Sequence, residues 1–382
     1  MTTLIRLYHK QAITNIMSAL AYPYDRIVTL SFLEMDAIRN DVIYHQQSIL
    51  DEYHLHPEFI NVDLTKHDLT RILTEFPDAD IDITSYDQHD SLRLLTATND
   101  YTNIFYYSNR DNNFFAIKGS VNHLRITNLH IRHSIESMGA SVKKNSLHYS
   151  PKDFHSEHNR HIIKKIYQIF SPSIDSGSYG LIEAFPYVLA KSNGRLLNFS
   201  NALNPIDRKA LSIFYQLQDL GVCTVCNEAK MIIAMNLKYS HIFKVMGQLL
   251  EMYCYIICLE SNVFDDVKMS VTIDYNGHFR QGFYDATSEI DLIAIKNNQP
   301  MYLSCKLNKL HQEDIYEIYT NANHFGGCCC HSLVAINKDT NKITEYLLNK
   351  ATELHVQIIE KQQLNQLDEL LSYALHTNST KD

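Results

Sequence analysis

The first 130 residues alternate between short apolar runs, which favour β-strands, and longer segments, which favour helices. The predicted strands are TLIRLYH, DRIVTLSF, EFINVDL and DADIDIT. Each is followed by a predicted helix, and TNIFYYSN and FFAIKG then predict a late hairpin pair. Strands that alternate with helices pair into a parallel, doubly wound sheet. The sequence therefore predicts an α/β fold for this part of the chain.

Polar residues gather after the fourth predicted strand, in the stretch DITSYDQHDS. In a doubly wound sheet, ligands bind beyond the carboxyl ends of the strands, here this stretch and LYHKQ after the first strand. A helix N-terminus with hydroxyl and amide donors can bind an anion. Helix capping by Asp90 or Ser91 explains the same residues without a ligand. No glycine-rich phosphate cradle is present, so a P-loop or dinucleotide-type site is not expected.

The middle of the chain, from about 131 to 240, is predicted to be mostly helical. Its stretch NPIDRKALSIFYQLQDLGVCTVCNEAKMIIAMN predicts a helix, a tight turn at Gly221 and a hairpin. This order resembles a winged-helix element, which either reads DNA or acts as a connector. The hairpin carries Asn227, Glu228 and Lys230 and has little positive charge, which favours the connector.

The C-terminal part combines a strongly apolar helix with a polar hairpin. The chain is apolar nearly all round from Ile242 to Leu259, which predicts a buried helix with Glu251 as its only acid. A carboxylate in such surroundings is paired, hydrated or metal-bound, unless it lies on an exposed strip. The stretch SEIDLIAIKNNQPMYLSCK then predicts a β-hairpin that turns at Asn297–Pro300. Strand alternation places Glu289 and Asp291 on one face, and Tyr302, Ser304 and Lys306 share another.

Composition restricts the location and the partners. A chain of 382 residues suggests two or three domains. A net charge of −9 does not favour non-specific coating of duplex DNA. The spacing of the eight cysteines does not suggest a disulfide framework, which fits a reducing compartment. No apolar run approaches the ~20 residues that span a bilayer, and the N-terminus lacks a signal-peptide layout. We therefore expect a cytoplasmic protein that does not associate with a membrane.

The residue types of the hairpin suit phosphodiester hydrolysis. That reaction uses a divalent cation to activate water and to neutralise developing charge. Mg²⁺ and Mn²⁺ prefer oxygen ligands. Asp291 offers a carboxylate, Lys306 an ammonium group, and Glu251 or Glu289 a further carboxylate.

The chain resembles the CRISPR-associated nucleases that join an N-terminal CARF domain to a C-terminal PD-(D/E)xK nuclease. The resemblance is carried by MGQLLEMYCY, which is similar to the family's Gly-x-Leu-Glu helix, by the hairpin above, and by a following helix that ends in HFGG. It covers essentially the full length. It implies a Rossmann-like CARF sensor at 1–130, a helical, winged-helix-like connector at 131–240, and a restriction-endonuclease-like α/β domain at 241–382.

What the resemblance implies is a homodimer of type III CRISPR antiviral defence. Such proteins bind a cyclic oligoadenylate, here expected to be cyclic tetra-adenylate, across two CARF domains, and then cut DNA or RNA with Mn²⁺ or Mg²⁺. The implied catalytic and metal-binding residues are Glu251, Glu289, Asp291 and Lys306. The implied ligand-binding residues are His9, Gln11 and Asn15 of the first loop, and Thr84, Ser85, Tyr86, Asp87 and Gln88 of the fourth-strand loop.

Two departures from the family pattern bear on these expectations. The loop that usually reads Thr-Gly-Gly-x-Lys lacks the glycines and the lysine in this chain. Ser304 stands where the family has the Glu of Glu-x-Lys. The missing acid could lie on the helix QEDIYEIYTNANHF, where a helical wheel favours Asp314 and distance along the chain from Lys306 favours Glu317.

Two other repairs leave the site functional: Glu289 and Glu251 suffice, or the Ser304 hydroxyl holds a metal-bound water. The alternative function is a catalytically impaired sensor that acts through the winged-helix-like middle segment.

Overall fold

The computed structural model gives the fold of most of the chain. The described residues are 1–8, 13–31, 37–64, 67–84, 88–98, 103–142, 154–175, 180–192, 195–200, 202, 208–275, 287–307, 309–326, 331–337 and 343–371.

The N-terminal unit is a six-stranded sheet with the order β3-β2-β1-β4-β5-β6. All neighbouring strands are parallel except β5 and β6, which form the predicted hairpin. Separate apolar clusters cover the two faces, one packed with α1 and α2 and the other with α3 and α4. The elements are β1 (Thr3–Leu7), α1 (Ile13–Ala21), β2 (Arg26–Ser31), α2 (Ala37–Glu52), β3 (Glu58–Asp63), α3 (Leu69–Glu75), β4 (Asp80–Asp82), α4 (Gln88–Ala97), β5 (Ile104–Ser108) and β6 (Asn113–Lys118). This unit confirms the predicted α/β fold with a parallel sheet.

The middle unit is built from helices and one small sheet with the order β8-β10-β9. As the sequence predicts, α8 is followed by a β9–β10 hairpin, and Gly221 between them has a φ of 69°. Its elements are α6 (Glu157–Asp175), α7 (Gly180–Lys191), β8 (Leu196–Asn198), α8 (Arg208–Asp219), β9 (Cys223–Asn227) and β10 (Ile232–Met235).

The C-terminal unit is a second six-stranded sheet, with the order β15-β14-β13-β12-β11-β7. Helix α9 packs on one face, and α5, α10 and α11 pack on the other. The elements are α5 (Ile131–Glu136), β7 (Ser141–Val142), α9 (Leu249–Glu260), β11 (Asp266–Asp274), β12 (Thr287–Lys296), β13 (Gln299–Lys306), α10 (Gln312–Gly326), β14 (His331–Ile336), α11 (Glu345–Glu353) and β15 (Val356–Ile359). Helix α5 and strand β7 directly follow the N-terminal unit in sequence, yet β7 pairs with β11 of this sheet.

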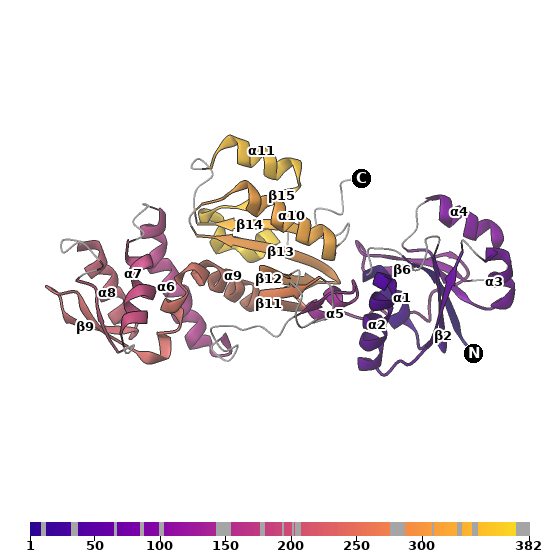
Figure 1. Ribbon diagram of the computed structural model, residues 1–382, viewed down its shortest axis with the longest axis horizontal. Helices are drawn as coiled ribbons and strands as arrows, with labels where there is room; N and C mark the ends of the chain where they lie inside the picture. Colours follow the sequence, from indigo (N-terminus) through magenta and orange to yellow (C-terminus); the bar gives the residue numbers. More distant parts are fainter. Residues whose placement is uncertain are drawn as a thin grey trace.

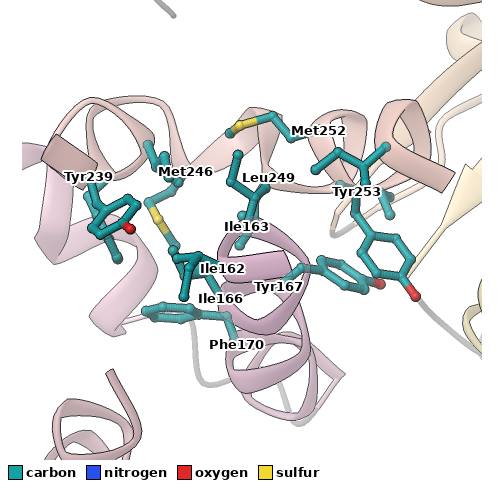
Figure 2. Packing of buried hydrophobic residues seen from close by; sticks show 14 of the residues in the cluster. Ile162, Ile163, Ile166, Tyr167, Phe170, Tyr239, Met246, Leu249, Met252 and Tyr253 are labelled. Atoms are coloured by element: carbon teal, nitrogen blue, oxygen red, sulfur yellow. The ribbon is translucent and has the colours of Figure 1, made fainter. Parts of the chain in front are cut away.

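The apolar segment that begins at Ile242 does not form one continuous helix. It starts with two 3₁₀ turns, Ile242–Lys244 and Met246–Gln248, and the α-helix α9 begins at Leu249. Figure 2 shows α6 side chains packed against this segment, with Ile163 near Leu249. The rings of Tyr167 and Tyr253 stack with centroids 4.2 Å apart. One apolar cluster therefore runs from the middle unit through α9 to the second sheet, and it fixes α9 in place.

The three units lie in a row, with the C-terminal unit between the other two (Figure 1). The helices within the described ranges are all too short or too polar to cross a membrane.

Candidate functional site

The predicted catalytic residues meet where the pairing of β12 with β13 opens. The two strands pair from Lys296 and Gln299 at the turn to Leu292 and Leu303. One residue further, the Oδ2 atom of Asp291 accepts the Cys305 N–H at 2.7 Å and the Ser304 hydroxyl at 3.2 Å. The Asp291 carboxylate therefore takes the place of a backbone acceptor, so that its position is fixed by β13.

Glu251 reaches the same place from α9. Its side chain is 7% exposed and accepts a hydrogen bond from the Ser270 hydroxyl at 3.4 Å. Ser270 lies in β11 and has a φ of 50°. The pairing of β11 with β12 skips both Ser270 and Asp291, because Met269 pairs with Leu292 and the next pair is Val271 with Ile290. This irregularity is a local break in the ladder at the position where the carboxylates gather.

Burial, together with the nearby carboxylates of Asp291 and Glu289, raises the pKa of Glu251 to about 9, against the opposing effects of the Ser270 hydroxyl and Lys306. Burial also raises the pKa of Asp291, against the opposing effects of the Cys305 N–H and Lys306. Burial thus opposes the ionisation of both carboxyl groups.

Lys306 makes an ion pair with α10. Its Nζ atom lies 3.0 Å from Oδ1 of Asp314, whose Oδ2 accepts the His311 N–H at 2.7 Å. Burial alone would lower the pKa of Lys306, but the hydrogen bond with Asp314 and the charge of Asp291 raise it above its ordinary value. The lysine is therefore charged at neutral pH.

The other acids of the predicted set lie at the edge of the site. Glu289 is exposed, although its charge acts on Glu251. Glu317 is exposed and accepts a long hydrogen bond, 3.5 Å, from the Ser288 hydroxyl. Asp314 is half-buried and its charge acts on Asp291. Of the two acids proposed on this helix, Asp314 lies nearer the centre of the site.

The donor atoms of this site are oxygens. Within the described ranges, no three or more His, Cys, Asp or Glu side chains are arranged so that they could hold a metal ion by themselves. Glu251 and Asp291 supply two carboxylates, and Ser270 and Ser304 bring hydroxyls beside them.

The N-terminal sheet changes strand order between β1 and β4, and buried charges mark this point. Arg6 and Asp82 are register partners and are 1% and 3% exposed. Arg6 donates from Nε to Thr29 at 3.2 Å and from a terminal nitrogen to Gln46 at 2.6 Å. Burial lowers the pKa of Arg6 to about 10 and raises that of Asp82, and each charge partly offsets this effect on the other.

Thr84 is the predicted ligand-binding residue that the structure describes in full. Its N–H donates to Asp82 at 2.8 Å, and its hydroxyl donates to the same carboxylate. The hydroxyl also accepts the Tyr107 N–H at 2.8 Å. Thr84 is therefore tied to the carboxyl end of β4 and to the neighbouring strand β5.

The rest of the predicted ligand set falls largely outside the described residues. His9, Gln11, Ser85, Tyr86 and Asp87 lie there, as do the side chains of Asn15 in α1 and Gln88 in α4. Because α4 begins at Gln88, Asp90 and Ser91 lie inside the helix, so the interpretation of either residue as its N-cap is wrong.

Four groups at these two sites are not predicted from the sequence. They are Arg6 and the buried strand residue Asp82 in the N-terminal sheet, and Ser270 and the Cys305 N–H beside the carboxylates of the C-terminal sheet. Arg6 could have been found, because a charge inside the apolar strand TLIRLYH must have a partner. The Cys305 N–H left no signal, because its role depends on the opening of a ladder and not on its side chain.

No family model matches the chain, and no curated protein matches it. Solved structures do match, among them two that cover nearly the whole length. Protein VC1899 from Vibrio cholerae has a TM-score of 0.75 and 13% identity, and the match covers 98% of both chains. Can2 from Sulfobacillus thermosulfidooxidans, solved in complex with cyclic tetra-adenylate, has a TM-score of 0.68 and 13% identity over 98% of this chain and 97% of Can2. The chain therefore has the fold of these two proteins from its first sheet to its last.

Proposed function

We propose that this protein is a metal-dependent nuclease of DNA or RNA that is activated by cyclic oligoadenylate in type III CRISPR antiviral defence. The observation that carries the proposal is the meeting of Asp291, Glu251 and Lys306 at the opening of the β12–β13 ladder. Because Can2, which shares the fold, was solved with cyclic tetra-adenylate, we propose the same activator for this chain.

The oxygen donors fit Mg²⁺ or Mn²⁺. Mg²⁺ is commonly held by one or two carboxylates, with water and substrate phosphate completing its ligands, so a full protein cage is not required. Glu251 and Asp291 would hold the ion. The pKa values of both carboxyl groups are raised, and a bound cation would stabilise their ionised forms. When bound, the ion would activate water and neutralise charge on the phosphate.

The protein residues supply position and charge. The Cys305 N–H and the Ser304 hydroxyl orient Asp291. Lys306, kept protonated by Asp314, presents an ammonium group that stabilises negative charge on the phosphoryl oxygens. We assign Ser304 an orienting role, and we propose Asp314 as the acid that compensates for the missing Glu, through Lys306. Glu289 and Glu317 supply further negative charge at the rim.

The sensor part of the proposal uses the strand-order switch of the first sheet. Ligands of such sheets bind at this switch, beyond β1 and β4. Thr84 and the residues that follow it, together with the loop after β1, would contact the cyclic oligoadenylate. A homodimer would place two such ends against one ring, and light scattering should give about 88 kDa, twice the 44.2 kDa of one chain.

The test is a cleavage assay on the purified full-length protein. Labelled single- and double-stranded DNA and RNA are incubated with Mn²⁺ or Mg²⁺, with and without cyclic tetra- or hexa-adenylate. We expect cleavage that needs both metal and activator, and that is lost in Asp291→Ala and in Lys306→Ala. Absence of cleavage under every combination would overturn the proposal.

A second candidate is a catalytically impaired sensor, favoured by one observation: Ser304 donates to Asp291 where the resembled family has a carboxylate. This candidate predicts ligand binding by calorimetry without any cleavage, and DNA binding that survives Asp291→Ala. Ser304→Glu separates the two, because a crippled site should gain activity and a compensated one should change little.

A further inference from the structure

One of the two turn residues of the candidate catalytic hairpin, Asn298, is buried against the N-terminal unit. Asn297 and Asn298 form this two-residue turn, with φ values of 49° and 62°, as tight hairpins require. Hairpin turns usually lie on the surface. Asn298, however, is 1% exposed and the adjoining Gln299 is 9% exposed. The buried side-chain amides of Asn298 and Gln299 therefore need hydrogen-bond partners within the protein.

The N-terminal unit and the segment after it supply these partners. Asn298 accepts the Leu129 N–H at 2.8 Å through Oδ1. Its Nδ2 lies within hydrogen-bond distance of the Tyr107 hydroxyl at 3.2 Å, of Asn112 Oδ1 at 3.0 Å and of the Thr127 carbonyl at 3.1 Å. We call this set, completed by Gln299, the turn clamp.

Gln299 adds a second hold on the same hairpin. Its Nε2 donates to the Asn109 carbonyl at 2.6 Å and lies 3.2 Å from the Arg110 carbonyl. Both carbonyls belong to the turn between β5 and β6. Two hairpins, one from each sheet, are thus joined turn to turn, and the join is specific because buried amides need their partners.

Tyr107 connects the turn clamp to the proposed ligand loop. Its backbone N–H donates to the Thr84 hydroxyl at 2.8 Å, and its own hydroxyl contacts both Asn298 and, at 2.5 Å, Asn112. Thr84 is the first residue of the predicted fourth-strand ligand loop. One residue of β5 therefore contacts the loop through its backbone and the catalytic hairpin through its side chain.

The other side of the catalytic site has an attachment of its own. Asp291 and Lys306 belong to the hairpin, whereas Glu251 belongs to α9, which packs on α6 of the middle unit (Figure 2) as well as on the sheet. A shift of the turn would reach Asp291 directly along the β12–β13 ladder, whereas α9 is also held by the middle unit. We therefore expect the distance between the two carboxylates to depend on the position of the turn.

We propose that Asn298 and Tyr107 are positioning residues that couple the fourth-strand loop to the catalytic hairpin. Ligand binding at the loop would move β5 and the turn clamp, and the hairpin would bring Asp291 into register with Glu251. This inference rests on the proposed function and adds the route by which the site is controlled.

The test compares Tyr107→Phe and Asn298→Ala with a matched control, Tyr53→Phe. Tyr53 also makes a hydroxyl contact between units, 3.4 Å to His133, but it does not contact the hairpin. Calorimetry gives the Kd for cyclic tetra-adenylate, hydrogen exchange follows the amides of 287–306, and cleavage is measured with and without the activator.

We expect both variants to bind the activator within about twofold of wild type and, like wild type, not to cleave without it. Activation by the ligand should fall at least tenfold, and the ligand-induced change in hairpin exchange should be lost, while Tyr53→Phe behaves as wild type. If Asn298→Ala does not fold, Tyr107→Phe, which removes one hydroxyl, decides alone. Variants that are activated normally would overturn this inference and leave the proposed function intact, whereas a wild type that neither binds nor responds to the ligand overturns both.

Discussion

Glu251 holds a carboxyl group where ionisation is opposed by burial and by two neighbouring carboxylates, which raise its pKa to about 9. In the unfolded chain this group loses its proton near its ordinary value of 4.5. Between these values the folded state binds the extra proton, so its contribution to stability is complete below pH 4.5 and is lost as pH rises towards 9. Glutamine has nearly the same shape as glutamate and does not ionise, so a protein with glutamine at this position should not lose this stability.

We therefore predict that Glu251→Gln stabilises the metal-free protein increasingly from pH 5 to pH 9, by at most about 1.4 kcal/mol for each pH unit. Differential scanning fluorimetry across this range measures the effect as a growing difference in Tm. The matched control is Glu313→Gln, because Glu313 is exposed and is not among the charges that shift the pKa of Glu251. A Tm difference that does not depend on pH would show that Glu251 does not titrate in this window.

Mn²⁺ should raise the Tm of wild type at pH 8 and raise that of Glu251→Gln much less.

Among the elements, α10 sets the position of the candidate catalytic lysine. Its first turn carries Glu313 and Asp314 next to each other, but Asp314 is half-buried in an ion pair with Lys306 and Glu313 is exposed. Asp314→Asn removes the charge that raises the pKa of Lys306, and with it the hold on the ammonium group. We predict at least a tenfold loss of cleavage from Asp314→Asn and none from Glu313→Gln, measured under activating conditions. Equal effects of the two substitutions would argue against a specific role for the pair.

Strands β1 and β4 carry two buried side chains of opposite charge, Arg6 and Asp82, as register partners. Asp82→Asn leaves the Arg6 guanidinium buried without its counter-charge, which typically costs about 3–5 kcal/mol. We predict a lower Tm and weaker binding of cyclic tetra-adenylate, because Asp82 also anchors Thr84. Asp78→Asn, four residues earlier and exposed, is the control for the change of residue type. A Tm equal to wild type in Asp82→Asn would mean that the pair does not stabilise the sheet.

The sequence predicts this architecture well wherever the signal is local. Alternation of strands and helices indicates the first sheet, and the NNQP stretch places the turn of the candidate catalytic hairpin within one residue or two. Helix α4 starts three residues earlier than its apolar pattern suggests, because Gln88–Asp90 carry no apolar periodicity. The 3₁₀ turns before α9 are equally invisible in an apolar run.

Contacts between distant segments are what the sequence does not contain. Residue type alone makes Asn298 an ordinary turn residue, whereas its burial depends on partners between 169 and 191 positions away. Asp291 was identified by its type, but its hold on the Cys305 N–H arises only when two strands diverge. Local chemistry thus identifies the acids and the lysine, and tertiary structure decides which of them meet.

For the whole molecule, the row of three units places the candidate catalytic sheet between the N-terminal sheet and the middle unit (Figure 1). The hairpin is tied to one neighbour through the turn clamp, and α9 is tied to the other through the shared apolar cluster. A site assembled from both sides responds to relative movement of the outer units, since interfaces tend to have discrete arrangements.

Coupling of this kind must be reciprocal, because the free energy that links two binding sites is the same in both directions. If cyclic tetra-adenylate strengthens the binding of Mn²⁺ at Glu251 and Asp291, then Mn²⁺ must strengthen the binding of cyclic tetra-adenylate by the same factor. We predict a factor of about 5–150, which is the usual range of such coupling. Calorimetric titration of cyclic tetra-adenylate with and without Mn²⁺ measures it directly, in the absence of nucleic acid. Asp291→Ala should abolish the difference while leaving the metal-free affinity unchanged, and an affinity that ignores Mn²⁺ in wild type would mean that the two sites are not linked.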